Sequence, residues 1–208
     1  MVCIFPKDET TDFLLPLYDK LCSLGFKGLH VDTNDNIELV LEAIGKAKVV
    51  VFLGHGTSYS LMGTPFNGDK TNIIHKDNIS ILKDKRMFLL SCRSAEFCET
   101  YNLYPSIGFG MMPTGLEDVH SMIDEDVNFP ALEQQDIDVY NKALINAISN
   151  AFNSGSMDKM EDLYNKVKLY ANIEITNCLL QKNTPMYREV ADLIQDMKNE
   201  CTIFKQQV

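Results

Sequence analysis

The fold is decided by the stretch VVVFLGHG at residues 49–56, together with a second stretch, RMFLLSC, at residues 86–92. Both are short and apolar without alternation, a pattern typical of strands buried on both faces of a parallel sheet. His55 and Cys92 are 37 positions apart (92 − 55 = 37), which leaves room for a right-handed crossover between two parallel strands. If the two strands are neighbours, both side chains lie at the carboxyl edge of the sheet, where open α/β sheets bind their ligands.

The sequence before the first stretch alternates between short apolar runs and amphipathic helical patterns. Strands are predicted at residues 2–5 and 28–31, and each is followed by a helical pattern. The residues that could cap these two helices are short and polar: Thr11 or Asp12 for the first, and Asp35 or Asn36 for the second. The alternation predicts an α/β layer fold with a mostly parallel central sheet.

The second half of the chain changes character twice. A helix is predicted at residues 95–101 and a further core strand at 106–110. Residues 111–129 contain a proline, a glycine and five acids, and we expect a long loop there. Beyond Pro130 the apolar residues recur at helical spacing. We therefore expect a core at residues 1–129, and a helical C-terminal region at 130–208 that packs on the core or extends it.

Composition excludes several classes of protein. The 208 residues carry a formal net charge of −10, which argues against nucleic acid as the main partner because phosphate contacts need clustered Lys and Arg. No apolar run approaches the roughly 20 residues that span a bilayer, so we expect no membrane partner. The six cysteines are scattered without paired spacing, which suits a reducing cytoplasm and indicates neither a disulfide framework nor a metal site.

A hydrophobic strand that ends in His-Gly, followed by one that ends in Ser-Cys, resembles the caspase-like cysteine peptidases. This group includes caspases, metacaspases, gingipains, separase and the bacterial CHAT proteases. The intervening sequence is similar too, with residues 60–63 and 71–74 suggesting a small hairpin and 77–82 a short helix. The segment SCRSAE at 91–96 is most similar to the CHAT type. The resemblance covers about residues 1–115 and implies a three-layer caspase-like sandwich.

The resemblance implies a thiol protease, that is, a hydrolase of the cysteine endopeptidase class with a Cys-His dyad and no cofactor or metal. A thiol attacks a carbonyl only as thiolate, so Cys92 needs a base, and a histidine can take its proton and return it to the leaving amine. The amides of Gly56 and Cys92 would then form the oxyanion hole. Protein or peptide would be the substrate. In such proteins the pocket before the cleaved bond includes the stretch before the cysteine, here Ser91, and the loop after the next strand.

That loop supplies Glu117 and Asp118, and acidic pockets in related peptidases select Lys or Arg. We therefore expect cleavage after a basic residue rather than after Asp. No internal linker for self-processing is visible, so control by a regulatory partner, or by self-association through the C-terminal helices, is expected. Small bacterial relatives suggest an effector of stress or defence.

Other interpretations remain open. His55 alone is typical of a loop histidine and Cys92 alone of a small buried side chain. A catalytically silent relative that acts as an interaction module would keep the same fold. A third possibility is an α/β protein that senses a small molecule, with the turn at residues 54–58 as an anion site. Cys98 is expected to be a core residue.

Overall fold

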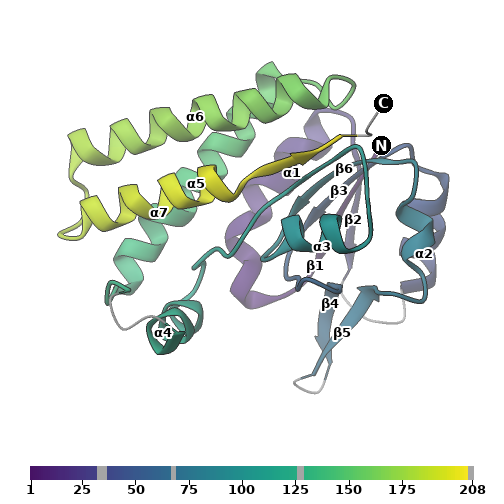
Figure 1. Cartoon of the computed structure of the whole chain (residues 1–208), viewed down its shortest axis with the longest axis horizontal. Helices are drawn as coiled ribbons and strands as arrows, with labels where there is room; N and C mark the ends of the chain where they lie inside the picture. The colour runs from purple at the N-terminus through teal and green to yellow at the C-terminus, as the bar shows by residue number, and fades with distance from the viewer. Residues whose placement is uncertain (32–36, 67–68, 126–128, 206–208) are drawn as a thin grey trace.

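The computed structural model describes residues 1–31, 37–66, 69–125 and 129–205, and a six-stranded sheet lies at its centre (Figure 1). The strands, in their order across the sheet, are β2 (Lys27–Val31), β1 (Val2–Pro6), β3 (Val49–Leu53), β6 (Arg86–Leu90), β7 (Ser106–Gly108) and β8 (Thr202–Phe204). The first five are parallel and β8 is antiparallel to β7. The predicted α/β fold with a mostly parallel sheet is confirmed.

Helices cover both faces of the sheet, which explains why its strands are apolar without alternation. Val49, Val51 and Leu53 of β3 belong to one buried cluster, whereas Val50 and Phe52 belong to another. The first cluster also holds residues of α1 (Leu15–Ser23), α5 (Gln134–Ser154), α6 (Met160–Gln181) and α7 (Tyr187–Glu200). The second holds residues of α2 (Ile37–Lys46), α3 (Ser94–Thr100) and the 3-10 helix η3 (Ile79–Leu82). Figure 1 shows α5–α7 and α2 on opposite sides of the sheet.

The small elements between β3 and β6 follow the sequence pattern. β4 (Leu61–Phe66) and β5 (Asp69–Ile74) form an antiparallel hairpin, and η3 leads into β6. Figure 1 shows the hairpin projecting from the carboxyl end of the sheet. The hairpin and the short helix that the sequence predicts in this interval are therefore correct.

The expected long loop at residues 111–129 is wrong, because the helix α4 (Leu116–Glu125) lies within it. Pro113 and Gly115 come just before this helix and do not interrupt it. Oδ2 of Asp118 accepts hydrogen bonds from the backbone N–H groups of Thr114 and Gly115 and from Oγ of Thr114, and so caps the first turn. Val119 is buried on the inner side of the helix.

Two further expectations need correction. The first helical segment is not capped by Thr11 or Asp12: a 3-10 helix, η1 (Glu9–Leu14), is capped by Asp8 and runs into α1. The strand β8 was not expected, since its three residues are too few to show an alternation. The caps expected at Asp35 and Asn36 lie outside the described residues.

Candidate active site

His55 and Cys92 occupy matching positions on two neighbouring strands. β3 and β6 pair in parallel with Leu53 opposite Leu90, and each site residue follows two positions later. A Cβ atom added to Gly56 would lie 2.6 Å from Oγ of Ser91 and 3.2 Å from the backbone oxygen of Cys92. The loops after the two strands therefore touch at a place where only glycine fits without displacement.

The two side chains line one small cavity of about 20 Å³, which Thr11, Met112 and Leu144 help to enclose. Cys92 is half-buried, and its Sγ lies 3.5 Å from the carbonyl oxygen of Met112, within reach of a weak S–H hydrogen bond. The structure thus brings the predicted histidine and cysteine together, beneath the segment that leads from β7 to α4.

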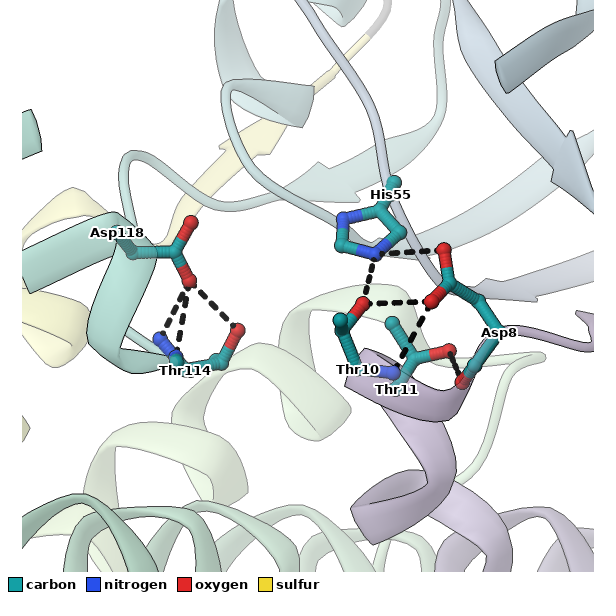
Figure 2. Close-up of polar contacts among 7 residues, drawn as sticks. Asp8, Thr10, Thr11, His55, Thr114 and Asp118 are labelled. Atoms are coloured by element: carbon teal, nitrogen blue, oxygen red, sulfur yellow. Dashed lines mark hydrogen bonds and ion pairs between the residues drawn. The ribbon is translucent and has the colours of Figure 1, made fainter. Parts of the chain in front are cut away.

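The imidazole of His55 is bound on one side by the loop after β1. Nε2 lies 2.7 Å from Oγ of Thr10 and 3.2 Å from Oδ2 of Asp8 (Figure 2). Because β1 is the neighbour of β3 in the sheet, its carboxyl end reaches the same edge. The sequence patterns described above do not place Asp8 or Thr10 at the site. The signal was available, since a buried strand followed by Asp-x-Thr is also typical of a helix N-cap.

A larger pocket of about 430 Å³ adjoins His55. The acidic residues that line it come from three elements: Glu9 of η1, Glu117 and Asp118 of α4, and Asp138 of α5. Figure 2 shows Asp118 and Thr114 on the side opposite His55 and Asp8. Asn141 of α5 also lines the pocket; its Nδ2 donates to the carbonyl oxygen of Thr114 at 3.0 Å. Oδ1 of Asn141 is buried and has no hydrogen-bond partner among the described residues.

The residues expected to bind substrate are placed differently from one another. Glu117 and Asp118 line the pocket, although from a helix rather than from a loop, and Asp118 also caps that helix. Ser91 is 1% exposed and, in the part of the chain that the structure describes, lines neither the cavity nor the pocket. Its buried Oγ has no hydrogen-bond partner among the described residues and lies against Gly56. Ser91 therefore acts on the site only through the packing beneath Gly56.

The cysteines outside the site are packing residues. All six cysteines are free thiols, and Cys98 and Cys201 are fully buried. Burial raises the pKa of each of these two thiols to about 12, so both stay protonated and unreactive at neutral pH. The prediction that Cys98 is a core residue is confirmed.

Among the described residues, no group of three or more His, Cys, Asp or Glu side chains is arranged to hold a metal ion. His120 is exposed on α4. No helix in the described part of the chain is long and apolar enough to cross a membrane. Comparison of the sequence with models of known protein families and with curated proteins gives no match in either case.

Proposed function

We propose that the protein is a caspase-like cysteine endopeptidase in which Cys92 is the nucleophile and His55 the general base. The observation that carries this proposal is the convergence of the two side chains. They follow register-paired ends of adjacent parallel strands and line the same cavity. This is the arrangement that nucleophile and base need, because the proton must pass directly between them. The resemblance of the two strand ends to the caspase-like peptidases supports the same reaction.

The reaction begins when the Cys92 thiol transfers its proton to His55 and Sγ attacks the carbonyl carbon of the scissile bond. The carbonyl π-electrons move onto oxygen, and the backbone N–H groups of Gly56 and Cys92 donate to that oxyanion. The absence of a Cβ at residue 56 lets this loop lie directly against Ser91 and the backbone of Cys92, which supplies the second N–H group. Collapse of the intermediate breaks the C–N bond, and the proton on His55 goes to the leaving amine. Water, deprotonated by His55, then hydrolyses the thioester and regenerates Cys92.

The acidic pocket beside His55 supports cleavage after Lys or Arg. A cation that leaves water needs a carboxylate partner, since an unpaired buried charge costs several kcal/mol. Glu9, Glu117 and Asp138 line the pocket, and the buried Oδ1 of Asn141 adds a neutral acceptor. A guanidinium or ammonium group supplies the donors that these oxygens need. This specificity is part of the proposal.

The enclosure of the thiol supports regulation. A cavity of about 20 Å³ holds about one water molecule and is too small for the acyl group of a peptide. The segment from β7 to α4 must therefore shift before Cys92 can react. Binding of a regulatory protein, or self-association through the C-terminal helices, would supply the energy for that shift. Leu169, Ile173 and Leu180 are exposed at helical spacing on α6 and support the second route.

The small-molecule alternative has less support. In the turn at residues 54–58, the N–H of Gly54 donates to the carbonyl of Leu90 and the N–H of Thr57 donates to the carbonyl of Ser60. These two amides are therefore not available to a bound anion. The silent-relative alternative keeps the fold without reactivity at Cys92.

As a peptidase with six free thiols, the protein would work in a reducing compartment such as the cytoplasm.

Labelling with an electrophilic peptide that carries Lys, Arg or Asp before an acyloxymethyl ketone tests the proposal. We expect covalent modification of the parent protein, fastest with the basic probes, and none of Cys92→Ala. His55→Ala should react at least about a hundredfold more slowly. Cys98→Ala is the matched control and should react like the parent. Labelling that persists in Cys92→Ala would refute the assignment. A parent that neither reacts with any probe nor cleaves a peptide library, together with an Asn141→Ala variant that does no better although it loosens the segment over Cys92, would favour the silent relative.

A further inference from the structure

We infer that Asp8 is a positioning residue that fixes the tautomer of His55 through a relay with Thr10. The inference deepens the proposed function, on which its catalytic consequence rests. Asp8 lies 47 residues before His55 (55 − 8 = 47), on the loop after β1, and no feature of the His-Gly and Ser-Cys stretches points to it.

The relay follows from counting protons. A threonine hydroxyl has one proton to donate, and Oγ of Thr10 donates it to Oδ1 of Asp8 at 2.7 Å. Toward Nε2 of His55, also 2.7 Å away, the same oxygen can then act only as an acceptor. Oδ2 of Asp8 lies 3.2 Å from Nε2, at ion-pair distance. The Thr10 oxygen that accepts at Nε2 requires a proton on this nitrogen, and the nearby carboxylate charge favours it, so Nδ1 is the basic nitrogen of the neutral ring.

The Asp8 carboxylate is held rigidly. Oδ1 also accepts the backbone N–H of Thr10 at 3.0 Å, which is the cap of η1. The backbone oxygen of Asp8 accepts the hydroxyl of Thr11, itself 3% exposed. The side chain of Asp8 is only 8% exposed, so water screens its interaction with the ring weakly. One carboxylate therefore fixes both the start of η1 and the ring of His55 (Figure 2).

Other ionisable groups also face His55. Glu9 comes from η1, Glu117 and Asp118 from α4, and Asp138 from α5, all lining the same pocket, while Cys92 lines the smaller cavity. Any of these can shift the titration of the ring. The tautomer is set by the atoms that contact Nε2, and for that reason the test measures the tautomer and not only a pH profile.

The critical variant is Asp8→Asn. The amide oxygen can keep the bonds to Thr10, while the amide nitrogen takes the place of Oδ2 and donates to Nε2. We expect His55 to change from the Nε2–H to the Nδ1–H tautomer, observed by ¹⁵N NMR of histidine-labelled protein at alkaline pH, with the signal assigned from His55→Gln. Alkylation of Cys92 by iodoacetamide near neutral pH should slow by at least about tenfold. The reason is that Nδ1 of His55 then carries a proton and can no longer take one from the Cys92 thiol.

Asp12→Asn is the matched control, since it neutralises an exposed carboxylate on the same 3-10 helix. It should leave the tautomer and the alkylation rate unchanged. Thr10→Val removes one acceptor and keeps Asp8, and we expect it to slow alkylation by a smaller factor that Thr10→Ser restores. These threonine variants keep the test decisive if Asp8→Asn does not fold.

The outcomes separate the two proposals. An unchanged Nε2–H tautomer in Asp8→Asn, with an unchanged rate of Cys92 alkylation, would overturn the role of Asp8 whatever the peptidase activity. A tautomer that changes as expected, in a parent protein that cleaves no peptide, would uphold the relay and reject the proposed function. If both stand, Asp8→Asn should lower kcat far more than it changes KM, since Asp8 lines neither the pocket nor the cavity.

Discussion

The carbonyl oxygen of Met112 lies 3.5 Å from Sγ of Cys92, so the segment after β7 covers the thiol that the proposed reaction uses. The cover is held from the side of α5, where Nδ2 of Asn141 donates to the carbonyl of Thr114. It is held from the side of α4 by Asp118, which binds both N–H groups at residues 114–115. A few hydrogen bonds therefore hold this segment over Cys92, and single substitutions can remove them.

Asn141→Ala should open the cover. It removes one partly buried hydrogen bond, worth about 1 kcal/mol, from a segment whose movement exposes Cys92. We expect the alkylation rate of Cys92 to rise by about fivefold at constant pH, which is that energy expressed as a ratio of rates. Asn150→Ala on the exposed side of the same helix is the control and should change nothing. Equal rates in the two variants would show that Asn141 does not hold the segment.

Cys92→Ala and Cys98→Ala should separate activity from stability. Cys92→Ala should abolish peptidase activity and move the melting temperature little, because the side chain is half-buried beside a cavity. Cys98→Ala should stay active but lose about 1 kcal/mol of stability, since its buried Sγ packs between α3 and the sheet. Calorimetry with a fluorogenic peptide assay measures both quantities, and an inactive Cys98→Ala that still folds would contradict the assignment.

Neutralising the pocket should change substrate preference. In Glu117→Gln combined with Asp138→Asn, we expect kcat/KM for Lys and Arg peptides to fall by at least about tenfold, because a cation entering the pocket loses two carboxylates. Asp118 is left intact because it caps α4. Glu189→Gln, on α7 and not among the residues that line the pocket, is the control. A parent protein that prefers Asp peptides, or a double variant with unchanged basic preference, would exclude the pocket as the specificity site.

Gly56→Ala should be inactivating, and Ser91→Ala should partly rescue it. The added Cβ meets Oγ of Ser91 at 2.6 Å, which no real contact tolerates, so the loop carrying the oxyanion N–H must move. Ser91→Ala removes that oxygen and, since it has no hydrogen-bond partner among the described residues, should cost little stability by itself. A double-mutant cycle on kcat measures the coupling. Strictly additive effects would argue against contact between the two loops in solution.

Glu200→Gln should stabilise the protein at neutral pH. Partial desolvation of the carboxyl, as the main cause, raises the pKa of Glu200, with the charge of Asp196 adding to the effect and a hydrogen bond from the Met111 backbone opposing it. Because the residue as a whole is exposed, the gain in stability should be small. A raised pKa means that the folded protein binds the proton more tightly than the unfolded chain, so the Glu200 contribution is fully favourable below the unfolded pKa. It is lost as pH rises through the folded pKa. The gain in melting temperature from the substitution should therefore shrink as pH falls from 8 toward 5. A gain that grows instead would contradict the sign.

The strands were predictable because burial on both faces leaves an unambiguous apolar run, as in residues 49–53. The meeting of His55 and Cys92 was predictable because each follows such a run directly. Asp8 was not predicted, because its contact with His55 depends on which strands are neighbours in the sheet. The strand order cannot be read from a single sequence. The helix α4 was not predicted because proline and glycine are typical of loops, although Pro113 and Gly115 both lie before its first turn. The acidic pocket needs α4, α5 and η1 together, which no local pattern contains.

The strand β8 carries a cost in assembly. β7 ends at Gly108 and β8 begins at Thr202, so their ladder closes a loop of 94 positions (202 − 108 = 94) that contains α4–α7. During synthesis on the ribosome, one edge of β7 stays without its partner strand until almost a hundred further residues have been made. During that interval the nascent chain presents a strand edge that other chains can join. We therefore expect the yield of folded protein in cells to depend on how quickly translation proceeds from β7 to β8.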